Sequence, residues 1–517
     1  MTFEIVFVLL SLLGMVAALI ADKMRPGMIL FSVVVLFLCA GILTPKEMLE
    51  GFSNKGMITV ALLFLVSEGI RQSGTLGQVI KKLLPQGKTT VFKAQLRILP
   101  SVAFISAFLN NTPVVVIFAP IIKHWAKSVN LPATKFLIPL SYVTILGGIC
   151  TLIGTSTNLV VHGMILEAGF EGFSMFELGK VGIFIAIAGI IYIFLFSKRL
   201  LPDARPDTAV PDEEVEEGEK LHRVEAVLGA RFPGINKKLK DFNFQRHYGA
   251  EVKEIKTRNG QRFVTNLDDV VLHEGDTLVV MADDTFIPTW GESSVFVLLT
   301  NGNEPDTSGK KKRWFALLLL VLMIVGATVG ELPVTKEMFP NIKLDMFFFV
   351  SITTIIMAWT NLFPARKYTK YISWDILITI ACAFAISKAM VNSGVADSVA
   401  KFIIGLSDDY GPHVLLAMVF IITNLFTELI TNNAAAALAF PLALSISAQL
   451  GVSPTPFFVV ICMAASASFS TPIGYQTNLI VQGIGNYKFT DFVRIGLPLN
   501  IITFLISIIL IPLIWNF

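Results

Sequence analysis

The sequence predicts an all-α polytopic membrane protein made of two related halves, with a small soluble α/β segment inserted between them. Composition is the first observation behind this prediction: 54% of the 517 residues are hydrophobic and 15% are charged, whereas soluble domains carry about 25% charged residues. The second is a series of apolar runs that approach the roughly 20 residues a membrane-spanning helix needs. The third is an internal repeat.

The two halves match at a nearly constant offset. Residues 57–84 align with residues 377–404 at a shift of 320, and the identical positions include Ser73 and Ser393 and also Gly74 and Gly394. Two polar motifs repeat as well, Leu109–Thr112 as Ile430–Asn433 and Leu152–Leu159 as Pro472–Leu479. Polar breaks at matching places in two related membrane halves are typical of a secondary transporter.

Each half is expected to contain three spanning helices, two short helices around an Asn-rich break, an interrupted helix and a final helix. The expected helices are 3–21, 27–45, 57–84, 95–109 with 113–127, 134–167 and 180–198 in the first half, and 314–332, 344–362, 374–404, 412–430 with 433–449, 455–485 and 493–515 in the second. The predicted domains are therefore a membrane repeat over 1–198, a soluble insert over 199–312 and a second membrane repeat over 313–517.

Loop charges predict the topology. If the Asn-centred pairs are re-entrant hairpins, each half crosses the membrane five times and the halves are inverted. With both termini outside, the cytoplasmic loops then hold 23 Lys and Arg and the external loops six, as the positive-inside rule requires. Two spans per hairpin would place Lys198, Arg199 and 310–313 outside. We therefore expect a multi-pass protein of the cell inner (plasma) membrane, with 199–312 in the cytoplasm.

The insert has a different composition. It opens with an acidic linker, Asp207–Glu219, and closes with a polar linker, 301–309. Between them, alternating apolar residues predict four strands and Asn259-Gly260 predicts a hairpin turn; the strands are Ala250–Lys256, Arg262–Thr265, Asp269–Leu272 and Thr277–Met281. A small α/β domain with its core at 220–290 is expected.

The polar motifs resemble those of the divalent anion/sodium symporter (DASS, SLC13-like) family, in its sulfate-type branch, over some 400 residues. The motifs that carry the resemblance are Asn110-Asn111-Thr112-Pro113, Gly154-Thr155-Ser156-Thr157-Asn158-Leu159, Thr431-Asn432-Asn433-Ala434 and Thr471-Pro472-Ile473-Gly474-Tyr475-Gln476-Thr477-Asn478. The insert resembles a TrkA-C (RCK C-terminal) regulatory domain through Phe232-Pro233-Gly234, Tyr248-Gly249-Ala250-Glu251-Val252 and His273-Glu274-Gly275-Asp276-Thr277-Leu278.

The resemblance implies two sodium sites and one anion site. The sodium ligands would be Asn110, Asn111 and Gly154 in the first half and Thr431, Asn432 and Gly474 in the second. The anion would contact Asn110, Thr112, Thr155, Ser156, Asn433, Tyr475 and Gln476, and Thr157, Asn158, Thr477 and Asn478 would support both sites. The family's members are elevator-type transporters and homodimers, so the resemblance also implies an elevator mechanism and a homodimer.

The residue types fit this chemistry. Asn, Thr, Ser and the carbonyls of an unwound helix offer uncharged oxygens to Na⁺, and the helix N-termini after each hairpin tip offer amides to an anion. No Arg or Lys lies in the motifs, so sodium is expected to supply the counter-charge. We predict a sodium-coupled symporter that imports a small inorganic divalent anion, sulfate first, because Ser156-Thr157 and Gln476-Thr477 replace the paired prolines of the dicarboxylate branch.

Several alternatives stay open at this point. Asn and Thr at a helix start are ordinary N-caps, but four such breaks in register favour binding. Proton- or sodium-coupled dicarboxylate transport is the alternative function, with Glu428 as the candidate proton carrier. An RCK-gated channel would need a Thr-Val-Gly-Tyr-Gly-like filter, which the sequence lacks. Scattered histidines argue against an enzyme.

The remaining expectations concern ligands and isolated charged residues. No cofactor besides Na⁺, no transition metal and no nucleic acid are expected, while a nucleotide-like ligand of the insert is a hypothesis by analogy. Four cysteines lie in apolar runs and are interpreted as packing residues: Cys39, Cys150, Cys382 and Cys462. Glu68 and Lys388 occupy equivalent positions and are assigned to the scaffold, where they could pair.

Overall fold

The computed structural model describes most of the chain. The described residues are 3–21, 24–85, 87–203, 222–229, 232–257, 261–283, 286, 290, 295–300, 310–406 and 411–517. The predicted linkers Asp207–Glu219 and 301–309 and the predicted turn Asn259-Gly260 lie outside these ranges.

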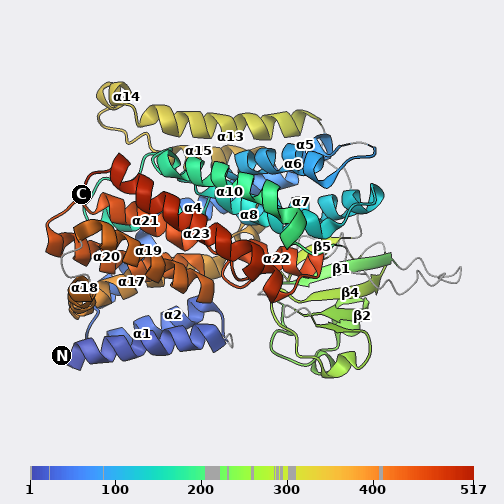
Figure 1. Ribbon diagram of the computed structural model, residues 1–517, viewed down its shortest axis with the longest axis horizontal. Coiled ribbons are helices and arrows are strands. Elements are labelled where there is room, and N and C mark those ends of the chain that lie inside the picture. The colour runs from blue at the N-terminus through green and yellow to red at the C-terminus, as the bar shows by residue number, and fades with distance from the viewer. Residues whose placement is uncertain are drawn as a thin grey trace, which may run out of the picture.

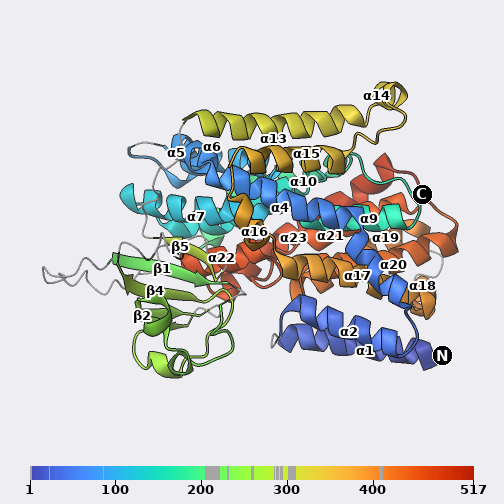
Figure 2. The same ribbon diagram turned by 180° about the vertical axis from the view of Figure 1, so that it is seen from behind.

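Long helices lie side by side along one axis, and a small β-sheet lies at one end of them (Figures 1 and 2). Both chain termini lie at the opposite end. Within the described residues, eight helices are long and apolar enough to cross a membrane, and four shorter apolar helices accompany them. The chain is therefore a mostly helical, multi-span membrane protein.

The two halves contain matching series of helices. The first half has α1 (Phe3–Ala21), α2 (Pro26–Cys39), α3 (Pro45–Glu50), α4 (Lys55–Gln72), α5 (Thr75–Leu83), α6 (Val91–Ser106), α7 (Asn111–Ser128), α8 (Leu137–Gly148), α9 (Ser156–Glu167) and α10 (Gly179–Leu200). The second has α13 (Lys310–Gly330), α14 (Pro333–Met338), α15 (Met346–Trp359), α16 (Tyr368–Tyr371), α17 (Trp374–Asn392), α18 (Val395–Leu406), α19 (Gly411–Leu429), α20 (Asn432–Leu450), α21 (Thr455–Ser466), α22 (Gln476–Gly485) and α23 (Phe489–Ile514).

The third predicted helix of each half is broken rather than continuous. The prediction of single helices over 57–84 and 374–404 is wrong, because α4 ends before α5 and α17 ends before α18. At both breaks a glycine adopts a left-handed backbone conformation, Gly74 with φ of 72° and Gly394 with φ of 76°. Glycine enters this region without steric cost. The two breaks are separated by the 320-residue offset and are therefore further evidence for the internal repeat.

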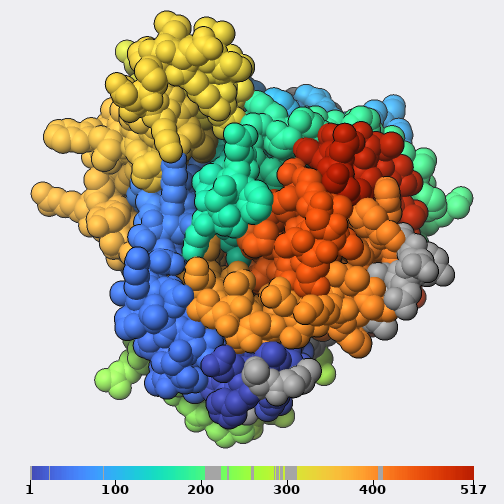
Figure 3. All heavy atoms as spheres, turned by 90° about the vertical axis from the view of Figure 1, so that its left-hand side faces the viewer, coloured from blue at the N-terminus to red at the C-terminus, as the bar shows by residue number. Residues whose placement is uncertain are grey.

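Helices of one half pack against helices of the other. Helix α2 lies on α17, and α15 lies on α4. The amide of Gly27 in α2 donates to the Asp375 carboxylate of α17 at 3.3 Å, and Lys55 of α4 pairs with Asp345, the N-cap of α15. Figure 3 shows first-half segments, in blue and teal, between second-half segments, in yellow and orange. Neither half forms a separate bundle.

Two helical hairpins point toward each other from opposite ends of the molecule. Both ends of the α6–α7 hairpin contact the last turn of α5 or the chain just after it: Arg97 donates to the Lys82 carbonyl at 2.9 Å and Trp125 to the Pro85 carbonyl at 2.9 Å. The α19–α20 hairpin begins at the other end, where the His413 ring contacts Phe517. The hairpin tips therefore meet in the interior of the helical body.

The insert forms a five-stranded sheet of order β3-β2-β4-β1-β5 in which every pairing is antiparallel. The strands are β1 (His222–Leu228), β2 (Glu251–Lys256), β3 (Arg262–Phe263), β4 (Thr277–Ala282) and β5 (Phe296–Thr300), and one short helix, α11 (Phe244–Tyr248), packs beside them. Aromatic side chains fill its core, which includes Phe232, Phe242, Phe244, Tyr248 and Phe296.

The sequence predicts β2, β3 and β4 but places a further strand wrongly. Residues Asp269–Leu272 form the end of a 3₁₀ turn and a single bridge from Val271 to Lys238, because no second strand runs beside them over that length. Strands β1 and β5 were not predicted. Since β5 pairs with β1 and follows residue 290, the folded insert extends past the predicted core of 220–290.

The sheet docks on the ends of α7 and α22. Glu225 of β1 accepts from Lys123 of α7 at 2.9 Å and from Lys256 of β2 at 3.4 Å. The turn before β4 lies beside α22, where a Cβ atom added to Gly275 would lie 3.6 Å from the Leu479 side chain. Burial raises the pKa of the Glu225 carboxyl, but the two ammonium groups outweigh it and lower this pKa to about 2. The docking ion cluster is therefore charged at neutral pH.

We predict that Glu225→Gln destabilises the docked sheet at pH 7. The expected decrease in the free energy of unfolding is on the order of 3 kcal/mol, because the pKa of this carboxyl falls from 4.5 to about 2. The carboxyl binds protons more weakly in the folded state, so its contribution is complete above about pH 4.5 and fades as pH falls toward 2. Thermal unfolding of both proteins at pH 7 and at pH 3 measures the difference.

The matched control is Asp269→Asn, which removes a carboxylate from an exposed lysine pair and is expected to change the melting temperature little. If Glu225→Gln lowered the melting temperature equally at pH 7 and at pH 3, the electrostatic explanation would be contradicted.

Candidate functional site

The four chain breaks predicted from the sequence meet at one place in the interior. They lie between α6 and α7, α8 and α9, α19 and α20, and α21 and α22. Side-chain hydrogen bonds join the two repeats there. Asn111 Nδ2 donates to Tyr475 Oη at 2.7 Å, Thr112 Oγ1 donates to Gln476 Oε1 at 3.2 Å, and Ser156 Oγ donates to Asn433 Oδ1 at 3.1 Å.

Side-chain capping does not explain these polar residues. Four helices start at the breaks, and their N-cap residues make no side-chain cap hydrogen bond: Asn110, Thr155, Thr431 and Tyr475. Elsewhere Thr44, Asn54 and Thr90 do cap their helices through the side chain. The polar groups at the breaks are therefore available for other contacts.

Oxygen atoms gather at the first hairpin tip. Asn111 is fully buried, and its Oδ1 accepts from Ser106 Oγ at 2.7 Å. A Cβ atom added to Gly148 would lie 2.7 Å from Asn111 Oδ1 and 3.1 Å from the Gly154 carbonyl oxygen, and one added to Gly154 would lie 3.0 Å from the Ala107 carbonyl oxygen. The glycines thus let an amide oxygen and backbone carbonyls converge, which is a donor set for a hard cation.

The second repeat has a corresponding cluster. A Cβ atom added to Gly474 would lie 1.9 Å from Ser468 Oγ and 2.3 Å from the Thr427 carbonyl oxygen. Ser468 and Thr427 follow Gly148 and Ala107 by 320 residues, the offset of the sequence repeat. The two clusters are therefore related by the internal repeat.

Two buried asparagines hold the unwound loops in place. Asn158 Nδ2 donates to the Thr151 carbonyl at 2.9 Å, and Asn478 Nδ2 donates to the Thr471 carbonyl at 3.1 Å. Each side chain also reaches a carbonyl one turn earlier, that of Gly148 or of Ser468. An unwound helix leaves carbonyls without intrahelical partners, and these amides satisfy part of that deficit.

Tyr475 lies between the two hairpin tips. Its hydroxyl contacts Asn111 of the first tip, Asn432 of the second and Thr155 Oγ1 at 2.9 Å. Thr157 adds a hydrogen bond to Asn433 Oδ1 at 3.3 Å. None of the hydrogen bonds that the described residues make at the breaks involves Arg or Lys, so this cluster offers dipoles rather than fixed cations.

Asn111 and Asn432 have different surroundings. The Oδ1 atom of Asn432 accepts from the backbone amide of Asn433 at 3.0 Å, while that of Asn111 points at Gly148. The hydroxyl of Thr431, one residue earlier, is buried and has no hydrogen-bond partner among the described residues. The repeated motif pairs Asn111 with Asn432 and Asn110 with Thr431, so the two equivalent asparagines direct their amide oxygens differently.

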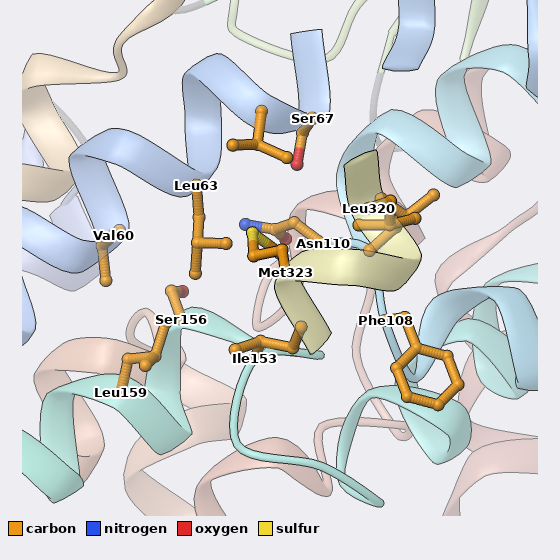
Figure 4. A pocket seen from close by; sticks show the side chains of 12 residues that line it. Val60, Leu63, Ser67, Phe108, Asn110, Ile153, Ser156, Leu159, Leu320 and Met323 are labelled. Carbon is orange, nitrogen blue, oxygen red and sulfur yellow. The ribbon is translucent and has the colours of Figure 1, made fainter. Parts of the chain in front are cut away.

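A small cavity borders the predicted anion residues (Figure 4). Asn110 and Ser156 form its polar edge, and Leu63 of α4 and Leu320 and Met323 of α13 line it. The cavity and its opening enclose about 350 Å³. The polar breaks therefore lie beside an apolar wall made by helices from both halves.

Sequence reasoning missed several side chains of the cluster. Thr151 Oγ1 accepts from the Gly154 amide at 3.2 Å, and Thr471 Oγ1 accepts from the Gly474 amide at 3.3 Å. In each repeat, the threonine stands three residues before the motif glycine, so the repeat itself was a signal for these two residues. Ser106 has no such signal, because only the folded hairpin brings it to Asn111.

The charged residues Glu68 and Lys388 do not pair with each other. Glu68 accepts from Arg71 at 2.6 Å within α4, and Lys388 is exposed on α17. The expectation that they could form an ion pair is therefore wrong, because Glu68 is bonded to Arg71 and Lys388 is exposed.

The fold and the convergent breaks define a helical membrane transporter. The citrate transporter family (CitMHS) matches residues 16–451, with a second match over 338–516. The chain therefore belongs to this family; it is a transporter and not an enzyme.

Full-length relatives give the same class. An uncharacterized transporter of Synechocystis is 30% identical over 94% of this chain and 93% of its own length. A probable sodium/sulfate cotransporter 3 of Chlamydomonas reinhardtii is 23% identical over 93% of this chain and 85% of its own. Sodium/sulfate cotransporter 2 of the same alga is 31% identical over 54% of this chain and 31% of its own.

We predict that Tyr475→Phe lowers the stability of the chain by about 2 kcal/mol or more, because it leaves the Asn111 amide and the Thr155 hydroxyl without their shared partner in a buried place. The measurement is the melting temperature of the purified protein. Tyr368→Phe, at an exposed residue, is the matched control, and equal melting temperatures for both variants would argue against a joining role for Tyr475.

Proposed function

We propose that this protein is a sodium-coupled symporter that imports a small divalent anion, with sulfate as the first candidate. The observation that carries the proposal is the meeting of four uncharged, oxygen-rich breaks from two repeats, joined across the repeats by Asn111–Tyr475 and Ser156–Asn433. Relatives whose names include sodium/sulfate cotransport support the choice of ions.

The absence of basic side chains from the described cluster supports coupling. An anion that binds among neutral dipoles gains most of its counter-charge from cations bound nearby, so anion and sodium occupancy stabilise each other. A dianion that enters against about 100 mV costs roughly 4.6 kcal/mol, at about 2.3 kcal/mol per charge. Two sodium ions cancel this electrical cost, and the two related oxygen clusters supply two sites.

The proposed topology is an inverted repeat of five spanning helices and one re-entrant hairpin in each half. Helix α1 starts at the end that holds the termini, whereas α13 starts near the sheet (Figure 1). The hairpins enter from opposite ends. Basic residues concentrate at the sheet end, in the last turns of α5 and α10 and the first turn of α13. By the positive-inside rule, the sheet lies in the cytoplasm and both termini outside.

Transport proceeds in this proposal by an elevator-type movement. The moving unit consists of the hairpins α6–α7 and α19–α20, the interrupted helices α8–α9 and α21–α22, and the final helices α10 and α23. The scaffold consists of the preceding helices of each half, through which two copies form a homodimer. The apolar wall of α4 and α13 beside Asn110 and Ser156 supports this division, since it opposes passage of a hydrated anion along a fixed path.

Carboxylate transport is the second candidate. The family description names citrate, so a dicarboxylate or related substrate, coupled to sodium or to protons, competes with sulfate for the same site. The Ser156-Thr157 and Gln476-Thr477 loops support the smaller oxyanion.

Replacing sodium with choline is expected to abolish sulfate accumulation in proteoliposomes, because the anion loses its counter-charges. Asn111→Ala is expected to raise the sodium concentration for half-maximal uptake about tenfold, in line with loss of one buried ligand. Asn54→Ala, at an N-cap whose side chain contacts the C-terminal half of α9 and not a break, is the control. Undiminished uptake in choline would refute sodium coupling, and competition by succinate, citrate, molybdate and phosphate would identify the substrate class.

The insert is proposed to be a TrkA-C-like regulatory domain that binds a small, nucleotide-like ligand. Deletion of 204–309 removes the whole sheet, including β5, and is expected to leave anion affinity unchanged but alter the transport rate, because the sheet lies against Lys123 of α7 and against Leu479 and Gly483 of α22 rather than against the predicted ion ligands. Scintillation-proximity binding and proteoliposome uptake separate the two quantities. Loss of anion binding would contradict this assignment.

A further inference from the structure

The second repeat contains a buried polar cluster beside its oxygen-rich break. The Glu428 carboxylate of α19 accepts from Asn500 Nδ2 of α23 at 2.7 Å and from the Ser470 backbone amide at 2.9 Å. Asn500 Nδ2 also donates to Ser470 Oγ at 2.9 Å. Glu428 has no ion-pair partner among the described residues, and charge inside a bilayer is costly unless it is compensated.

The first repeat has no counterpart to this cluster. Glu428 and Ser470 correspond at the 320-residue offset to Phe108 and Cys150. The final helices are aligned by Gly182 and Gly496, which pack on the equivalent carbonyls of Ile149 and Phe469. This alignment of the final helices pairs Asn500 with Ala186. At the 320-residue offset, Ser468 corresponds to Gly148. Four polar residues of one repeat thus replace four apolar or small residues of the other.

The cluster is continuous with the proposed second cation site. Ser468 Oγ lies 3.3 Å from the Thr427 carbonyl oxygen and 3.5 Å from Glu428 Oε2. The same two oxygens, Ser468 Oγ and Thr427 O, occupy the space that a Cβ on Gly474 would fill. Asn500 is 93% buried, and its Oδ1 atom has no hydrogen-bond partner among the described residues. An unsatisfied amide oxygen and an uncompensated carboxylate therefore lie next to a cation donor set.

We propose that Glu428 is a ligand of a monovalent cation, Na⁺, in the second repeat, which makes the two cation sites unequal. This inference rests on the proposed sodium coupling and deepens it. The site has a full negative charge where the Asn111 site has amide and carbonyl dipoles alone, and cation affinity rises with ligand charge. The second site therefore fills at lower sodium concentration than the first, before the anion arrives.

The test is sodium binding to the purified full-length chain without sulfate or any other divalent anion. Sodium chloride replaces choline chloride at constant ionic strength, and the rise in melting temperature gives the sodium concentration for half-maximal stabilisation. Glu428→Gln keeps the shape and hydrogen-bonding atoms but removes the charge. We expect it to raise this concentration about tenfold or more, as for loss of a charged buried ligand.

Two further variants separate binding from a structural role. Glu68→Gln removes a carboxylate that pairs with Arg71 in α4 and is expected to leave the sodium concentration unchanged. Asn500→Ala introduces the residue that the first repeat has at this position, and a smaller shift in the same direction as Glu428→Gln is expected. If Glu428→Gln fails to fold, Glu428→Asp and Asn500→Ala carry the test.

The outcomes distinguish this inference from the proposed function. A lower melting temperature for Glu428→Gln with an unchanged sodium dependence would show that Glu428 only anchors the 468–470 loop, and would overturn the inference while sodium coupling stands. If sodium stabilises neither protein and sulfate uptake persists in choline, sodium coupling and the inference both fail. If the sodium concentration for half-maximal stabilisation rises only in Glu428→Gln and Asn500→Ala, the result supports Glu428 as a sodium ligand.

Discussion

The structure depends on how unwound backbone is tolerated inside an apolar body. Carbonyls and amides that leave a helix ladder within a bilayer must find other partners, since water is absent there. Here the four breaks satisfy one another at one place. Asn158 and Asn478 donate to carbonyls of their own loops, and Tyr475 bonds Asn111, which lies 364 residues earlier in the chain. The same arrangement that repairs the backbone also concentrates oxygen atoms.

That concentration explains the proposed chemistry without a catalytic or permanently charged group. Dipoles that are already oriented by hydrogen bonds bind ions with little reorganisation. Because the described residues place no basic side chain at the breaks, the proposed function requires that cation and anion each bind well only when the other is present. The exception is Glu428, whose negative charge is peculiar to the second repeat. Internal symmetry thus builds two sites of similar backbone, and single side chains make them different.

The docked sheet gives the molecule a connection between its surface and this interior. Helices α7 and α22 both begin at the breaks, and both lie against the sheet, α7 through Lys123 and α22 through Leu479 near its start and Gly483 near its end. A rigid helix transmits a displacement along its length, so a ligand-dependent change in the sheet would bias the position of the tips. This geometry is compatible with regulation of the transport rate without direct contact with the solute.

The sequence by itself determined the membrane class, the repeat and the four breaks, because hydrophobic length and polar interruptions are local patterns that survive without knowledge of contacts. It also located most of three strands. Only the tertiary structure decided which residues meet across the repeats, such as Asn111 with Tyr475, and which carry a role without a local signal, such as Ser106 and Asn500. It also separated Asn111 from Asn432, whose motifs look alike. The physical reason is that these contacts join segments hundreds of residues apart, where register is set by packing rather than by periodicity.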